Sequence, residues 1–204
     1  MQVELYGIRS AEDFASAIAL GANRIGFDFR PASQQSPQMI SSLAGILPDR
    51  ADLESLDAHR VASSVCRVGL FSDGLPQDII TRIVGYRLDV VELYGEMPPL
   101  LISNLRRTID PDIRVGVKFC KVLDIASAAD LQRCYDYDDV ADSYLFRTSD
   151  VSLLEGYTGR LPFFVEASDS TIEKLRHLST PLFEGIQLFY SLTADMSIKP
   201  FTMA

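Results

Sequence analysis

The chain alternates short apolar segments with helix-like segments, and the same five residues open two of these units. The copies are Val3-Glu4-Leu5-Tyr6-Gly7 and Val91-Glu92-Leu93-Tyr94-Gly95. A period of two places the glutamate and tyrosine of each copy on one face of a strand, with the valine and leucine on the other. Two strands that end alike and lead directly into helices predict repeated βα units with polar groups gathered at the strand ends.

Eight strands are predicted along the chain. They cover residues 3–7, 23–29, 65–71, 88–94, 113–119, 142–147, 161–167 and 183–189. Mostly helical segments separate them, and strand–helix–strand units with short loops form parallel sheets. Eight such units close into a TIM (βα)8 barrel, so we predict an α/β fold with a single barrel domain over residues 1–204. The alternative is an open doubly wound sheet, but the sequence has neither a Gly-x-Gly-x-x-Gly after the first strand nor a Walker-type loop.

The charge and cysteine usage of the chain bound its partners and its compartment. A net charge of −9 without a run of Lys and Arg disfavours nucleic acid and anionic membranes as partners. No signal-like or membrane-spanning run is present. The cysteines Cys66, Cys120 and Cys134 are odd in number and lack metal-ligand spacing, and only two histidines occur. These features predict a cytoplasmic protein without a metal site.

The first half of the chain carries a distinctive set of segments. They are Val3-Glu4-Leu5-Tyr6-Gly7-Ile8, Ala11-Glu12-Asp13, Gly21-Ala22-Asn23-Arg24-Ile25-Gly26-Phe27-Asp28-Phe29, Arg30-Pro31-Ala32-Ser33 with Ser36-Pro37, Val68-Gly69-Leu70-Phe71, and Leu88-Asp89-Val90-Val91-Glu92-Leu93-Tyr94-Gly95-Glu96. In this order and spacing they resemble the phosphoribosylanthranilate isomerase family. The resemblance runs over most of the chain and is weaker after Lys118.

The resemblance implies a (βα)8 barrel that performs an Amadori rearrangement in tryptophan biosynthesis, converting N-(5-phosphoribosyl)anthranilate to its 1-deoxyribulose isomer. The reaction needs a general acid, a general base and donors that hold a phosphate, and it uses no cofactor. The family's base is a cysteine whose position holds Tyr6 here. Tyrosine, with a reference pKa of about 10 against about 8.5 for cysteine, is the poorer base. The family's acid is an aspartate ending strand six; that position falls on Phe146 or Arg147, and neither replaces a carboxylic acid.

The positions that hold the rest of the substrate are also changed. The family's second-loop arginine, which faces the anthranilate carboxylate, corresponds to Gln34 or Gln35, and Arg30 stands in the same loop. Where the family pattern has a glutamine and a histidine on strand four, this chain has Glu92 and Tyr94.

The phosphate loops depart from the family pattern in the same way. Glu166-Ala167 replaces the glycine pair that offers backbone N–H groups to the phosphate, and a carboxylate there repels it. Phe189-Tyr190-Ser191 replaces a Ser-Ser-Gly, and only Tyr157-Thr158-Gly159 keeps part of a Gly-rich loop. The resemblance thus implies the scaffold, while the substitutions predict an altered or inactive isomerase.

Three interpretations of the interior carboxylates remain. In the first, Glu4 (a lysine in the family pattern) and Glu92 pair with Lys118 and Arg147, because isolated buried charges are costly. In the second, Glu4 or Glu92 is the base of a different isomerase or lyase, with Lys118 holding an anion and Tyr6 donating a proton. The third is a non-catalytic barrel that binds a ligand or a protein partner.

These arguments define the candidate site at the C-terminal face of the barrel, where barrel enzymes work. The candidate catalytic residues are Tyr6, Arg147 and Lys118, and the candidate ligand contacts are Arg30, Gln34, Glu92, Tyr94, Glu166 and Gly159. We expect a small-molecule ligand there, no cofactor, and a monomer or homodimer.

Overall fold

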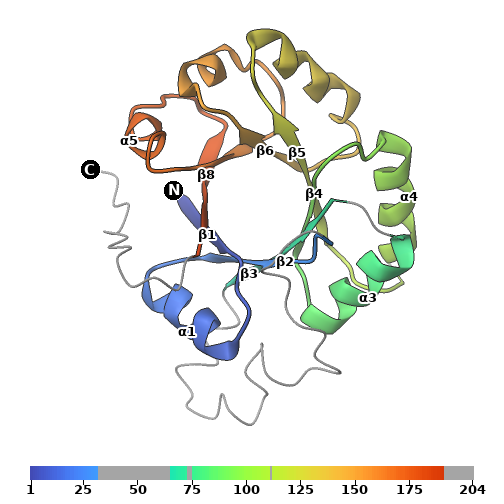
Figure 1. Ribbon diagram of the computed structural model, residues 1–204. Coiled ribbons are helices and arrows are strands. Elements are labelled where there is room, and N and C mark those ends of the chain that lie inside the picture. The colour runs from blue at the N-terminus through green and yellow to red at the C-terminus, as the bar shows by residue number, and fades with distance from the viewer. Residues whose placement is uncertain (32–64, 73–74, 111, 191–204) are drawn as a thin grey trace.

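The computed structural model describes residues 1–31, 65–72, 75–110 and 112–190. Within them, eight parallel strands close into a barrel in the order β1 to β8, and helices surround it (Figure 1). The strands are β1 Gln2–Tyr6, β2 Arg24–Asp28, β3 Cys66–Phe71, β4 Val90–Leu93, β5 Lys118–Asp124, β6 Ser143–Arg147, β7 Phe163–Glu166 and β8 Phe183–Phe189. The helices are α1 Ala11–Ala19, α3 Pro76–Tyr86, α4 Pro99–Ile109 and α5 Ile172–Leu175, with 3₁₀ helices η1 Ala128–Asp136 and η2 Val151–Gly156. The predicted barrel is confirmed.

The two faces of the strands bury different side chains, as the period-two alternation predicts. Residues such as Leu5 and Ile25 face outward and join the larger apolar core under the helices. A smaller apolar cluster fills the barrel interior: Val68, Leu70, Val90, Tyr94, Cys120, Val122, Leu145 and Phe164. Glu4 and Glu92 share the interior with this cluster. Cys120 is therefore a packed interior thiol.

Local signals in the sequence explain where the helices begin. Ser10 caps α1 by accepting a hydrogen bond from the backbone N–H of Asp13 at 3.1 Å. Proline occupies the first position of α3 and α4, where its missing N–H costs nothing. Gly7 turns the chain from β1 toward α1 with a φ of +88°, a conformation that other residues rarely adopt.

Strand five is displaced from its predicted position. Its predicted span was 113–119, but β5 is Lys118–Asp124. The backbone N–H groups of Ile113 and Arg114 bond to the carbonyl of Ile109, the last residue of α4, so these residues form the turn that follows the helix. Gly116 then turns the chain with a φ of +82° before β5 begins. The apolar alternation at residues 113–117 therefore belongs to a connection, and the prediction was wrong because it read that alternation as a strand.

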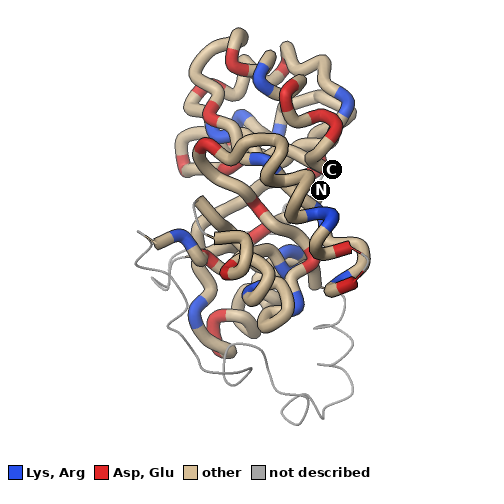
Figure 2. Tube along the Cα trace, turned by 90° about the vertical axis from the view of Figure 1, so that its right-hand side faces the viewer, with Lys and Arg blue, Asp and Glu red and all other residues tan. Residues whose placement is uncertain are grey.

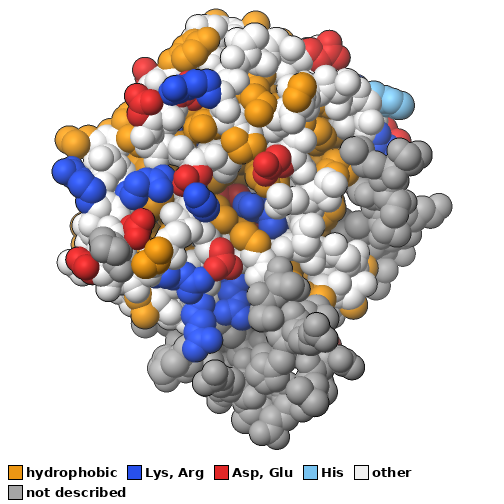
Figure 3. Space-filling view, turned by 180° about the vertical axis from the view of Figure 1, so that it is seen from behind, with side chains coloured by type: hydrophobic (Ala, Val, Ile, Leu, Met, Phe, Trp, Pro, Cys, Tyr) orange, Lys and Arg blue, Asp and Glu red, His pale blue; other side chains and the backbone are white. Residues whose placement is uncertain are grey.

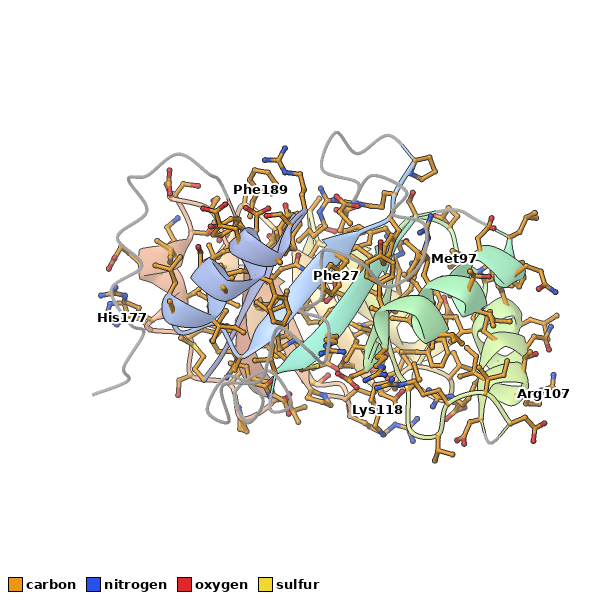
Figure 4. All side chains as sticks on the ribbon, turned by 90° about the horizontal axis from the view of Figure 1, so that it is seen from below. Phe27, Met97, Arg107, Lys118, His177 and Phe189 are labelled. Carbon is orange, nitrogen blue, oxygen red and sulfur yellow. The ribbon has the colours of Figure 1, made fainter. Side chains whose placement is uncertain are left out.

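The displacement moves Lys118 to the other end of the barrel. Phe189, at the end of β8, and Lys118, at the start of β5, lie at opposite ends of the molecule (Figure 4). Figure 3 looks onto the end where the strands begin. Acidic and basic residues are interspersed along the trace (Figure 2). Asp124 is the last residue of β5.

Candidate functional site

A chain of hydrogen bonds crosses the C-terminal mouth of the barrel. The Tyr6 hydroxyl donates to Glu166 Oε1 at 3.1 Å, and Arg147 Nε donates to Glu166 Oε2 at 2.6 Å. Arg147 also pairs with Asp124, Nη1 to Oδ1, at 3.1 Å. Strands β1, β5, β6 and β7 end at this face and bring the four side chains together. Tyr6, Arg147 and Glu166, from β1, β6 and β7, are therefore in direct contact.

The proton affinities of these groups follow from their surroundings. Burial and the Glu166 carboxylate raise the pKa of Tyr6, so its hydroxyl keeps its proton near neutrality. Burial lowers the pKa of Arg147, but Glu166 and Asp124 outweigh it and leave that pKa above its ordinary value. Tyr6 is thus a hydrogen-bond donor and Arg147 a fixed cation.

A second ion pair covers the opposite side of the mouth. Arg30 donates to both carboxylate oxygens of Asp28, at 2.8 and 2.7 Å. Its guanidinium lies 4.4 Å from the Tyr94 ring centroid, within the range of a cation–π contact. The hydrogen bonds to Asp28 raise the pKa of Arg30. The described mouth thus contains two arginines, three carboxylates and two tyrosines.

A buried polar network lies one layer below the mouth. Arg24 Nε donates to Glu4 Oε2 at 2.8 Å, and Arg24 Nη2 lies 3.7 Å from Glu92 Oε1. Gln187 Nε2 donates to Glu4 at 2.9 Å and to Glu92 at 2.7 Å. The Tyr94 hydroxyl donates to Gln187 Oε1 at 3.2 Å and reaches Glu92 Oε2 at 3.5 Å. Tyr94 therefore connects the network to the mouth.

The network holds two carboxylates and one guanidinium in the dry barrel interior. Burial and the nearby Glu4 carboxylate raise the pKa of Glu92 well above its ordinary value. Burial lowers the pKa of Arg24, but Glu4, Cys66 and Glu92 outweigh it and raise that pKa. The arrangement places the Arg24 guanidinium against Glu4 and near Glu92, and it favours the protonated form of Glu92.

The predicted partners of the interior carboxylates were wrong. Glu4 and Glu92 pair with Arg24 and Gln187, whereas Arg147 lies at the mouth. Lys118 is 60% exposed and pairs with Asp142 at 3.4 Å, at the other end of the barrel. It therefore contributes nothing to the mouth.

The structure also corrects the predicted position of Gly159 and decides between Phe146 and Arg147 at the end of β6. Gly159 was expected in a mouth loop, but its neighbour Arg160 pairs with Asp138 and Asp139, which precede β6. Gly159 therefore lies on the side where the strands begin, in the connection between η2 and the start of β7. Phe146 packs outward against Tyr157 and Phe163, so Arg147 occupies the mouth. Gln34, Gln35, His59 and Ser191 lie outside the described residues.

The sequence reasoning missed Arg24, Gln187 and Asp124. Arg24 is the first residue of β2 and is opposite Glu4 in the β1–β2 register; Gln187 is opposite Glu4 in the β1–β8 register. The period-two alternation of β2 already placed Arg24 on the same face as Asp28. Asp124 was missed because the fifth strand was misplaced.

Lys121 is a buried lysine of β5 that the site does not use. It faces outward, and its ammonium donates to the carbonyls of Leu93 at 3.2 Å and Gly95 at 2.6 Å. Burial lowers its pKa to about 8. Its contacts tie the end of β4 to β5, which is a structural role.

No group of three or more His, Cys, Asp or Glu side chains within the described residues is placed to hold a metal ion. None of the helices in the described part of the chain is both long and apolar enough to cross a membrane.

The closed parallel barrel, with its polar side chains at the C-terminal strand ends, defines the (βα)8 class. The chain is 31% identical over 180 residues to N-(5'-phosphoribosyl)anthranilate isomerase of Rhodospirillum rubrum, covering 80% of this chain and 75% of the relative. The Parabacteroides distasonis enzyme is 23% identical over 98% of this chain and 88% of its own length. The chain belongs to the phosphoribosylanthranilate isomerase family.

Solved structures support the same fold. Phosphoribosyl anthranilate isomerase in complex with reduced 1-(o-carboxyphenylamino)-1-deoxyribulose 5-phosphate matches with a TM-score of 0.67 and 22% identity, over 95% of this chain and 89% of that one. Monomers of the dimeric Thermotoga maritima enzyme match with a TM-score of 0.66 and 21% identity, with the same coverage. No family profile matches the chain.

Proposed function

We propose that this member of the family binds a small polar ligand at its mouth and does not carry out the family's ordinary Amadori rearrangement. The contact that carries the proposal is the chain Tyr6–Glu166–Arg147. By the resemblance, these residues stand at the positions of the base, the phosphate-binding glycine and the acid. Here they hydrogen-bond to one another.

Proton transfer is the first step that this arrangement disfavours. A base must lose its proton near neutral pH, whereas burial and Glu166 hold the proton on Tyr6. An acid must give up a proton, and an arginine paired with two carboxylates does not. Neither position therefore supports the family's chemistry.

Phosphate binding is the second step that it disfavours. Glu166 ends β7 and places a carboxylate where the resemblance implies backbone N–H donors. Both arginines of the described mouth already pair with carboxylates, Arg30 with Asp28 and Arg147 with Glu166. Three carboxylates against two guanidiniums favour a neutral or cationic polar ligand, which the two tyrosine hydroxyls and rings can also contact.

Turnover of N-(5-phosphoribosyl)anthranilate tests the proposal. We expect no rate above the uncatalysed reaction for the natural chain. The triple variant Tyr6→Cys, Glu166→Gly, Arg147→Asp restores the residues that the resemblance implies and is the matched comparison; we expect it to gain measurable turnover. Robust turnover by the unaltered protein would overturn the proposal.

One observation favours a second function, a different isomerase or lyase. The Tyr94 hydroxyl lies between the mouth and Glu92, whose raised pKa keeps a proton available. In this alternative Glu92 supplies the proton through Tyr94, without Lys118. If a reaction is found, Glu92→Gln is expected to abolish it, and unchanged turnover would exclude this role.

We further propose that residues 1–204 form a single barrel domain that acts in the cytoplasm as a monomer or homodimer, without cofactor, metal, nucleic acid or membrane. The closed barrel of the described residues supports the first point. The dimeric Thermotoga maritima relative supports a dimer as one of the two states.

A further inference from the structure

Three arginines gather where the strands of the barrel begin, at the end opposite the mouth. Arg67 is the second residue of β3, Arg87 directly follows α3, and Arg114 lies between α4 and β5. The pairing of Val68 with Val90 places Arg67 beside Asp89. Asp89 accepts the backbone N–H of Arg67 at 2.9 Å and a hydrogen bond from the Arg114 guanidinium. The fold therefore brings the backbone of Arg67 and the guanidinium of Arg114 to one carboxylate, and Arg87 lies near enough for its charge to act on Arg67.

The charges of this three-arginine cluster do not balance. One carboxylate oxygen of Asp89 accepts a hydrogen bond from the Arg114 guanidinium, and the other accepts one from the backbone N–H of Arg67. In the part of the chain that the structure describes, Arg67 Nε is buried and has no hydrogen-bond partner. Burial lowers the pKa of Arg67; the Asp89 carboxylate opposes this shift, and the positive charges of Arg87 and Arg114 add to it. A buried donor without a partner calls for an ion or water.

The neighbouring charges do not supply the missing anion. Lys118 and Arg106, at the same end of the barrel, share the single carboxylate of Asp142. Figure 3 shows Lys and Arg side chains on this face with Asp and Glu side chains among them. The charges that act on Arg67 are one carboxylate, Asp89, and two guanidiniums, Arg87 and Arg114.

We propose that Arg67, Arg87 and Arg114 form a binding site for a phosphate group. Guanidinium groups bind phosphate through paired N–H donors, and Arg67 Nε is one donor left over by the fold. The site is separate from the mouth and does not depend on the function proposed there. Its ligand is either free inorganic phosphate or the phosphate ester of a metabolite.

Titration calorimetry with inorganic phosphate and with ribose 5-phosphate, at neutral pH and low ionic strength, tests the site. We expect binding by the natural chain and a loss of about tenfold or more in affinity for Arg67→Met, because a charge-assisted hydrogen bond is removed. Tighter binding of the ester assigns the site to a metabolite, and equal binding assigns it to free phosphate.

A second variant protects the test against misfolding. Arg87 has a φ of +52°, a conformation that glycine adopts without strain. Arg87→Gly thus removes the charge while relaxing the backbone, and we expect it to weaken phosphate binding in a well-folded protein. Arg160→Met is the matched control: it removes one arginine elsewhere on the same end and is expected to retain binding.

Three results would overturn the proposal. The first is no phosphate binding by the natural chain. The second is unchanged affinity in both Arg67→Met and Arg87→Gly, which would place the phosphate elsewhere. The third is an equal loss in Arg160→Met, which would show a response to net charge alone.

Discussion

The barrel contains two sets of ionic side chains that differ in their access to water. Arg24, Glu4 and Glu92 form the interior set, and their side chains are at most 7% exposed. Arg147 and Glu166 belong to the mouth set and are 43% and 26% exposed. The same kinds of ion pair therefore have different consequences: the interior pairs bear on stability, whereas water screens those at the mouth and leaves them available to a ligand.

The largest expected effect comes from removing the interior cation. Arg24→Met leaves Glu4 as a buried carboxylate without the guanidinium that it pairs with. We expect the free energy of unfolding to fall by about 3–5 kcal/mol, measured by denaturant titration. The matched control, Arg147→Met at the mouth, is expected to cost at most about 1 kcal/mol. Equal losses in the two variants would remove the distinction between the two sets.

The next largest effect is a pH dependence of the free energy of unfolding that comes from Glu92 in the barrel interior. Because burial and Glu4 raise the pKa of Glu92, the folded state binds more protons than the unfolded state above about pH 4.3, the ordinary value for glutamate. The stability contributed by this proton is present below that pH and is lost as the pH rises toward the raised pKa.

Glu92→Gln isolates that proton, because glutamine has nearly the shape of a protonated glutamate. In the natural chain, we expect the free energy of unfolding to fall by up to about 1.4 kcal/mol per pH unit because of this group, and in the variant we expect this fall to be absent. The variant therefore becomes more stable relative to the natural chain as the pH rises. Denaturant titrations between pH 5 and pH 8 (about the range where most proteins stay folded) measure it. Glu12→Gln, on the exposed side of α1, is the control. A parallel pH profile for Glu92→Gln and the natural chain would contradict the buried proton.

The smallest effect is expected at Lys118, which belongs to neither set. Lys118→Met removes an exposed ion pair with Asp142 at the other end of the barrel. We expect a change in the free energy of unfolding within about 0.5 kcal/mol, and no change in ligand binding or turnover at the mouth. Any loss of mouth function in this variant would contradict the corrected position of strand five.

Strand β1 shows which part of the site the sequence predicted correctly. The period of two placed Glu4 and Tyr6 on the interior face, and the structure confirms this because the spacing of side chains along a strand is a local property. Strand β5 shows its limit. The apolar alternation at residues 113–117 has the same period, but these residues connect α4 to β5, and the first two of them bond back to the carbonyl of Ile109. Periodicity alone does not distinguish a strand from an extended connection.

The sequence by itself determined the order of the units, the face of each strand that carries polar groups, and the family. Only the tertiary structure decided which polar groups meet. Arg24 and Gln187 reach Glu4 through strands β2 and β8, the latter more than 180 residues away along the chain. Such pairings depend on the register in which the barrel closes, and no local pattern encodes that register.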